Sequence, residues 1–331
     1  MLTEEIQMSD IMVSVYCLAF NHERYIHNAL EGFVHQDTNF KYEVFVHDDA
    51  STDKTAEIIR HYATKYPDII KPIYQKENQY SKGISISREI IFPKMKGKYV
   101  AICEGDDYWC DNNKLQKQVD FLENNEEYSA CVHNTEQINC RNGEKSYIND
   151  SKIDMDLQFE KVVERGNSQF QLSSLVCRKD LFLIPSEITA KGFGDYPLAI
   201  YLMFNGKIRY FKEVMSVYRL FSEGSWTSQH YMNVELSKQI MTQENLVDFL
   251  RNLFKYSQLH YIRQKYVDEI EKVLRTQEVE LLMIKNDGKQ ILKKYKDVYD
   301  EFSLIEKIKV RFPLLRSLIR KVKKTGECKN G

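Results

Sequence analysis

The chain has 331 residues, of which 43% are hydrophobic and 29% charged, a composition typical of a globular protein with one large domain and an appendage. Its 47 Lys and Arg nearly balance 48 Asp and Glu, so the net charge of -1 excludes a global attraction to nucleic acid. Seven cysteines without a CxxC pair exclude a disulfide framework and a zinc site of common spacing, and they favour a reducing cytoplasm.

The first ten residues, MLTEEIQMSD, are acidic where a signal peptide is basic. No later stretch approaches the roughly 18 apolar residues that a membrane span needs. We therefore expect a cytoplasmic protein that is neither exported by a signal peptide nor anchored by a spanning helix.

Four short apolar runs follow, and each predicts a buried strand. They lie at residues 12–19, 42–47, 70–74 and 99–103. Segments with helical spacing lie between them at 26–34 and 55–62, and another lies after them at 114–123. Strands that alternate with helices in this way predict an α/β fold with a mostly parallel sheet.

The second part of the chain is less regular. It predicts strands at 129–132, 208–211 and 214–218, an apolar run at 172–177 and a helix at 196–205. We expect residues 1–230 to form one domain, with a first half to about 128 and a second half from about 129. Charged, periodic segments predict a helical region over 231–331, whose helices offer a surface for self-association.

Acidic residues follow two of the predicted strands. Asp48 and Asp49 follow the second strand, and Glu104, Asp106 and Asp107 follow the fourth. Ligands of an open parallel sheet bind beyond the carboxyl ends of its strands, where these five carboxylates would meet. Such a cluster needs a cation, and hard oxygen ligands suit Mg²⁺ or Mn²⁺ bound to phosphates. Helix capping at 48–53 and a solvated acidic turn at 104–107 remain the alternatives.

Three segments, at residues 13–21, 46–55 and 102–109, resemble the motifs of inverting glycosyltransferase family 2, whose fold is called GT-A. The resemblance covers about residues 12–227 and includes bacterial polysaccharide and capsule enzymes. It implies a Mn²⁺- or Mg²⁺-dependent transferase in surface polysaccharide biosynthesis. The donor would be a nucleotide-diphospho-sugar, by family habit a UDP-sugar, and the acceptor a hydroxyl of a glycan or lipid-linked saccharide, with inversion at the anomeric carbon.

The resemblance also implies the site residues. The donor would contact Ala19, Phe20, Asn21, Asp48, Asp49, Ser51, Glu104, Asp106, Arg219 and Trp226. Asp48 or Asp49 would bind the base and ribose, in the half of the domain before residue 129. Glu104 and Asp106 would take the two acidic positions of the DxD metal motif, with Asp106 as the direct ligand, although Glu104 stands where Asp is usual.

Asp195 matches the region that supplies the general base, in which an acidic residue opens a helix in the acceptor half of the domain. A carboxylate there would take the proton of the acceptor hydroxyl. Helix capping, with Pro197 in the first turn, is the alternative, and both roles can coexist. Residues 217–226 resemble the family's late motif, in which an Arg and a Gly/Ser/Trp turn lie on the diphosphate; Arg219 suits this through bidentate hydrogen bonding. A strand followed by a surface turn is the other interpretation.

Residues 305–324 contain eight Lys or Arg among apolar residues and one acid. This pattern is typical of a peripheral membrane contact, and a basic face packed on the protein is the alternative.

Other enzyme classes lack their motifs here. A sugar-nucleotide pyrophosphorylase needs a glycine-rich loop after the first strand, and the first glycine is Gly32. No GxGxxG or Walker motif occurs, which excludes a dinucleotide dehydrogenase and a kinase-type NTPase. A non-catalytic module that binds a sugar nucleotide or glycan on the same fold remains the alternative.

Overall fold

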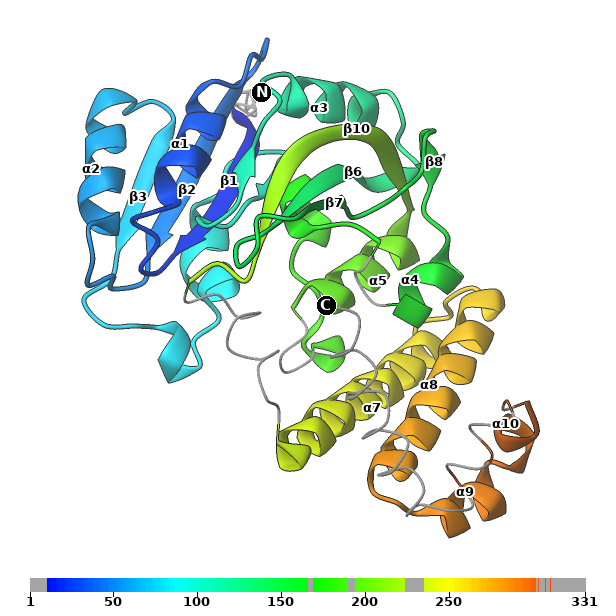
Figure 1. The fold of residues 1–331 in the computed structure, drawn as a ribbon. Coiled ribbons are helices and arrows are strands. Elements are labelled where there is room, and N and C mark those ends of the chain that lie inside the picture. Colours follow the sequence, from blue (N-terminus) through cyan, green and yellow to red (C-terminus); the bar gives the residue numbers. More distant parts are fainter. Residues whose placement is uncertain are drawn as a thin grey trace, which may run out of the picture. The chain divides into compact units, whose positions relative to one another are not determined.

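The computed structural model describes residues 11–165, 169–189, 194–223 and 235–301, together with residues 303, 307 and 310. The chain divides into two compact units, the first formed by Met1–Ile184 and Asp195–Met232, the second by Pro185–Gly194 and Asn233–Gly331. In the described residues the first unit contains the sheet and the second contains the C-terminal helices (Figure 1).

The first unit has a ten-stranded sheet over its described residues. The strands are β1 (Ile11–Ala19), β2 (Lys41–Asp48), β3 (Ile70–Tyr74), β4 (Tyr99–Ile102), β5 (Tyr108–Trp109), β6 (Tyr128–Asn139), β7 (Lys145–Tyr147), β8 (Met155–Asp156), β9 (Val176–Arg178) and β10 (Lys207–Leu220). The main order is β3-β2-β1-β4-β9-β6-β10-β5, with β7 paired to β6 and β8 to β10. The first four predicted strands are β1 to β4, they pair in parallel, and the predicted α/β class is confirmed.

Helices cover this sheet. They are α1 (Ile26–Val34), α2 (Thr55–Lys65), α3 (Lys114–Glu123), α4 (Phe159–Arg165) and α5 (Asp195–Asn205). In α1 the residues Ile26, Ala29, Leu30 and Phe33 share one face, and all four are buried. Every residue of β2 after Lys41 is buried, as expected for a strand covered on both faces. Figure 1 shows α1 and α2 beside β1, β2 and β3.

The prediction of two short strands at 208–211 and 214–218 is wrong. The structure has one strand, β10, which pairs in parallel with β6 along its length. The register shifts between Phe211 and Val214, where Lys212 and Glu213 lie. A β-bulge places extra residues in one strand without ending it, so this polar pair resembles a turn in the sequence. Figure 1 shows the resulting curvature of β10 over β6.

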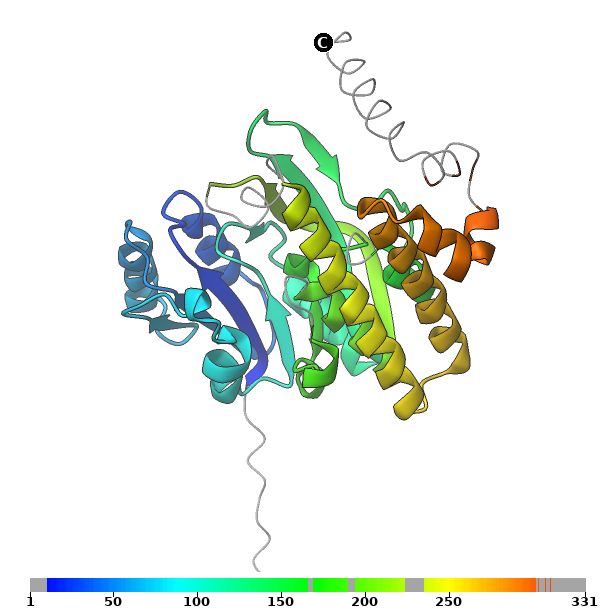
Figure 2. The same cartoon turned by 90° about the horizontal axis from the view of Figure 1, so that it is seen from below.

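The second unit is helical in its described residues. Its helices are α7 (Leu236–Leu259), α8 (Gln264–Ile284), α9 (Gly288–Lys294) and α10 (Lys296–Glu301). Figures 1 and 2 both show α7 and α8 side by side as an antiparallel pair. In the described part of the chain, no helix combines the length and apolarity that crossing a bilayer requires. The predicted basic segment 305–324 lies outside the described residues except for residues 307 and 310.

Candidate functional site

The loops that follow β1 and β2 are held together by side-chain hydrogen bonds. The backbone N–H of Asn21 donates to Ser51 Oγ at 2.9 Å, and the backbone N–H of Thr52 donates to Asn21 Oδ1 at 2.9 Å. Asn21 and Ala50 have positive φ angles of 56° and 63°, a conformation that Asn tolerates better than most residues. The two loops therefore form one ordered edge beside Ala19, which pairs with Asp48 across the parallel strands.

Asp48 and Asp49 differ in what their carboxylates contact. Both oxygens of Asp49 accept backbone N–H groups, from Gln79 at 2.7 Å and from Tyr80 at 3.0 Å. Asp48 is 3% exposed, and its Oδ1 has no hydrogen-bond partner among the described residues. Burial raises the pKa of Asp48, while hydrogen bonds from Ser51 lower it. Because buried polar atoms are rarely left unpaired, we expect Asp48 Oδ1, and not the oxygens of Asp49, to accept a hydrogen bond from a ligand.

The acidic loop, residues 104–107, follows β4. Asp106 and Asp107 are buried, whereas Glu104 is exposed. Although Glu104 is open to solvent on one side, desolvation by the protein around it, followed by the charges of Asp106 and Asp195, raises its pKa. Desolvation and the charge of Asp106 also raise the pKa of Asp107 well above its ordinary value. The loop therefore concentrates negative charge that a cation would stabilise.

Asp195 is the first residue of α5, and its Oδ1 accepts the Tyr196 amide at 3.0 Å. This bond satisfies one free N–H of the first turn, but it differs from an N-cap, which accepts the N–H two or three residues further on; both the capping and the catalytic role of Asp195 therefore stay predictions. Burial raises the pKa of Asp195, and its charge in turn raises that of Glu104. Asp195 and the acidic loop therefore lie within electrostatic reach of one another, although they are about 90 residues apart in sequence.

Arg219, near the end of β10, joins the acidic loop to α1. Its Nη1 donates to the Asp106 carbonyl at 2.6 Å, and its Nη2 donates to Asn28 Oδ1 at 2.9 Å. The guanidinium also lies over the rings of Tyr25 and Tyr108, at 5.2 and 4.6 Å from their centroids. In this arrangement Arg219 holds the acidic loop in place, and its contact with a diphosphate stays a prediction.

Three residues without a predicted role belong to the site or its support. His22 Nδ1 is buried without a partner among the described residues, and an added Cβ at Gly105 would lie 2.9 Å from it. Ser222 donates from Oγ to Asp106 Oδ2 at 2.7 Å. Lys114 is fully buried under Trp109. The predicted donor residue Trp226 lies outside the described residues.

The carboxylate oxygens of the acidic loop could supply some, but not all, of the ligands of a divalent cation. Carboxylate oxygens are the ligands that Mg²⁺ and Mn²⁺ prefer, and a cation would offset the repulsion that Asp106 and Asp195 add to desolvation in raising the pKa of Glu104. Among the described residues, no three His, Cys, Asp or Glu side chains form a ready metal site. An ion held by Asp106 and Glu104 would therefore need further oxygen ligands, such as those of a bound diphosphate.

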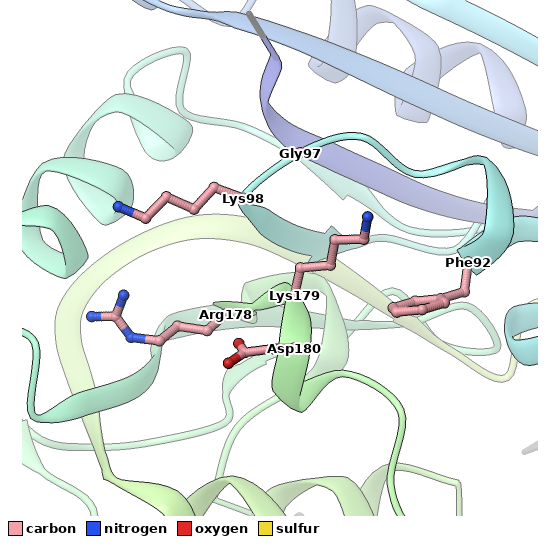
Figure 3. Close-up of a pocket in the computed structure, with 6 residues that line it drawn as sticks. All are labelled: Phe92, Gly97, Lys98, Arg178, Lys179 and Asp180. Carbon is pink, nitrogen blue, oxygen red and sulfur yellow. The ribbon is translucent and has the colours of Figure 1, made fainter. Parts of the chain in front are cut away.

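A cavity of about 460 Å³ lies elsewhere in the first unit (Figure 3). It is lined by Phe92, Gly97, Lys98, Arg178, Lys179 and Asp180. Its cations have structural partners, because Lys98 pairs with Glu123 at 2.6 Å, Arg178 donates to carbonyl groups at the end of α3, and Lys179 donates to the Met95 carbonyl. Since Gly97 and Lys98 of the cavity precede β4 and the acidic loop follows it, the two lie at opposite ends of this strand.

Comparison with known proteins gives one family. The model of Glycosyl transferase family 2 matches residues 14–175. The chain is 34% identical over 220 residues to an uncharacterized protein of Mycobacterium tuberculosis, covering 66% of this chain and 61% of that protein. It is 32% identical over 112 residues to the UDP-Glc:alpha-D-GlcNAc-diphosphoundecaprenol beta-1,3-glucosyltransferase of Escherichia coli, covering 34% of this chain and 41% of that enzyme.

A solved structure shares the fold. It is a mannosyltransferase from Pyrobaculum calidifontis in complex with GDP-Man and Mn²⁺, with a TM-score of 0.55 and 16% identity over 92% of this chain and 80% of that one. At this identity the likeness shows the fold alone, and the predicted GT-A class is confirmed.

Proposed function

The chain belongs to glycosyl transferase family 2, and from this premise we propose that it transfers a sugar from a UDP-sugar to a hydroxyl of a lipid-linked or polymeric glycan, with inversion and with a divalent metal. The observation that carries the proposal is the placement of Asp48, the acidic loop and Asp195 around one part of the first unit. The end of β1 supports this placement, because Ala19 pairs with Asp48 and the Gly105 N–H donates to the Leu18 carbonyl at 2.8 Å.

The nucleotide would bind at the ends of β1 and β2. Asp48 has an unpaired, buried Oδ1 that can accept a hydrogen bond from a base N–H group. Phe20 exposes 43% of its surface next to this edge, and its ring offers a face for base stacking. The Escherichia coli relative is named for a UDP-glucose donor, and this supports UDP as the nucleotide.

The diphosphate would lie over the acidic loop. Asp106 and Glu104 would hold Mn²⁺ or Mg²⁺ together with oxygens of the donor, as the GT-A neighbour's complex with Mn²⁺ supports. When bound, the ion stabilises the negative charge that develops on the leaving diphosphate. Arg219, which fixes the main chain at Asp106, keeps this loop in one conformation before the donor arrives.

Asp195 would act as the general base. Burial raises its pKa, which makes the ionised carboxylate a better proton acceptor. In a single displacement the base takes the proton of the acceptor hydroxyl on the side opposite the leaving diphosphate, and the anomeric configuration inverts. The diphosphoundecaprenol acceptor in the name of the Escherichia coli relative supports a lipid-linked acceptor.

A thermal-shift panel tests the proposal. UDP, UDP-glucose, UDP-N-acetylglucosamine and GDP-mannose are each added with and without Mn²⁺ to the wild type, to Asp106→Ala and to Asp195→Asn. We expect a metal-dependent rise in melting temperature with UDP-sugars, its loss in Asp106→Ala and its retention in Asp195→Asn.

Donor turnover then separates the enzyme from a binding module. Hydrolysis or transfer by the wild type should fall roughly 10²–10⁴-fold in Asp195→Asn, the range for removal of a general base. Binding without any turnover by the wild type would instead favour a non-catalytic module that binds sugar nucleotides. The absence of metal-dependent stabilisation by any of these nucleotides would reject the proposed site.

A further inference from the structure

Ser222 joins the segment after β10 to the acidic loop. The Ser222 side chain is fully buried, and its Oγ donates to Asp106 Oδ2 at 2.7 Å. The two residues are separated by 116 positions in the sequence. A hydroxyl that donates to a carboxylate forms a charge-assisted hydrogen bond, which is about twice as strong as a neutral one.

The main chain at Phe221 turns Ser222 toward the acidic loop. Phe221 has a φ of 62°, the left-handed conformation that a bulky side chain rarely adopts. The Phe221 ring packs under the Arg141 guanidinium at 3.8 Å. Beyond it, the Glu223 amide donates to the Tyr25 hydroxyl at 3.3 Å, so the turn is fixed on both sides of Ser222. Such strained positions persist when their surroundings determine them, and they concentrate at functional sites.

We propose that Ser222 is a positioning residue for the metal-binding carboxylate of Asp106. Its hydroxyl holds Oδ2, which stops the carboxylate from rotating and keeps Oδ1 directed to one place. This inference rests on the proposed function, because it assumes that Asp106 contacts the divalent ion. It goes beyond that function by making the segment after β10 a part of the metal site, through Ser222.

The expected size of the effect follows from other metal sites. A group that hydrogen-bonds a metal ligand orients it, and its removal typically weakens metal binding roughly 10–100-fold. The Ser222 contact is the kind for which this holds, since donor and acceptor are both buried and the bond is short. Nucleotide binding in the absence of metal should change little, because Asp48 lies on a different strand and does not depend on Ser222.

The experiment measures Mn²⁺ affinity directly. Free Mn²⁺ is followed by its electron paramagnetic resonance signal in titrations with UDP, with a protein-free series as the blank. The variants are Ser222→Ala, which removes the hydroxyl, and Ser222→Cys, which nearly keeps the volume but donates weakly. Ser257→Ala in α7 is the matched control, since Ser257 is also fully buried and its Oγ donates at 2.7 Å, to the Phe254 carbonyl.

We expect Mn²⁺ affinity to fall about 10-fold or more in Ser222→Ala, partly in Ser222→Cys, and not in Ser257→Ala. A Mn²⁺ affinity of Ser222→Cys equal to that of the wild type would show that Ser222 only fills space. An unchanged Mn²⁺ affinity of Ser222→Ala would also overturn the inference. If Ser222→Ala does not fold, as judged by its melting curve, Ser222→Cys carries the test. Failure of the wild type itself to bind Mn²⁺ with UDP would count against the proposed function and not only against Ser222.

Discussion

Lys114 is a buried cation in the core of the first unit, and its environment explains why it should weaken the fold. It is the first residue of α3, and its Nζ donates to Gln118 Oε1 at 2.7 Å and lies 4.3 Å from the centroid of the Trp109 ring. The structure gives it no ion pair with a carboxylate among the described residues. Burial accordingly lowers its pKa from 10.5 to about 7.

Replacement of Lys114 by Met should stabilise the protein at neutral pH. Between about pH 7 and 10.5 the unfolded chain binds a proton that folded Lys114 does not, so wild-type stability rises with pH in this window. Relative to Lys114→Met, the wild type should be less stable by a few kcal/mol at pH 7 and below, since each pKa unit corresponds to about 1.4 kcal/mol. The gap should narrow as the pH rises toward 10.5.

Urea unfolding of both proteins at several pH values between 6 and 10 measures this gap. Gln116→Met on the same helix is the control, because Gln116 carries no charge, and its difference from the wild type should not depend on pH. A Lys114→Met gap that stays constant with pH would show that Lys114 keeps its proton in the folded protein.

The polar residues of the site differ in how far the sequence could predict them. Asp48, Glu104 and Asp106 are predicted because Asp48 ends β2 and the acidic loop follows β4, and the carboxyl ends of parallel strands meet on one side of a sheet. Ser222 was not found, because its partner lies 116 residues away and nothing local marks it. Lys114 carries no signal either, since a lysine in the first turn of a helix is ordinarily solvated.

At the scale of the elements, α1 packs against β5, the strand that follows the acidic loop. Trp109 in β5 packs edge-to-face on Phe33 of α1 at 4.9 Å, and its Nε1 donates to the Ser173 carbonyl at 2.8 Å. Gly32 allows the close approach, because an added Cβ there would lie only 2.7 Å from the Trp109 carbonyl oxygen. The helix therefore supports the strand that follows the acidic loop.

Gly32→Ala should be destabilising although Ala favours a helix. The gain in helix propensity is at most about 1 kcal/mol, whereas overpacking costs about 1–3 kcal/mol and here involves backbone that cannot rotate away. Urea unfolding should show the loss. Gly194→Ala is the control, since no described atom lies within 4 Å of its added Cβ. Equal stability of Gly32→Ala and the wild type would mean that α1 can shift away from β5 without a measurable loss of stability.

Whole elements were easier to predict than their ends. The parallel strands and α1 to α3 follow from apolar spacing, because burial of one face or of both faces leaves a period in the sequence. β10 was divided into two strands, because the register shift at Lys212 and Glu213 looks like a turn when its partner strand is not known. Pairing partners are long-range information, and a single sequence carries little of it.

For the whole molecule, the division into two compact units implies two separate cores. The core of the first unit lies between the sheet and its helices, and includes Val13, Leu30 and Val44. In the second unit Val279 of α8 and Ile291 of α9 belong to one cluster of buried residues. Units with their own cores can unfold in separate steps, so stability need not be a property of the whole chain.

Calorimetry of two variants tests this independence. Ile291→Ala removes buried methyl groups from the second unit and should lower its stability by about 2–5 kcal/mol, while Gly32→Ala acts on the first unit only. We expect two thermal transitions, of which each variant lowers a different one. The sugar nucleotide bound at the proposed site should raise the transition that Gly32→Ala lowers and leave the other in place. If both variants instead shift a single common transition, the two units unfold as one cooperative body, and the sugar nucleotide should then raise that one transition in both variants.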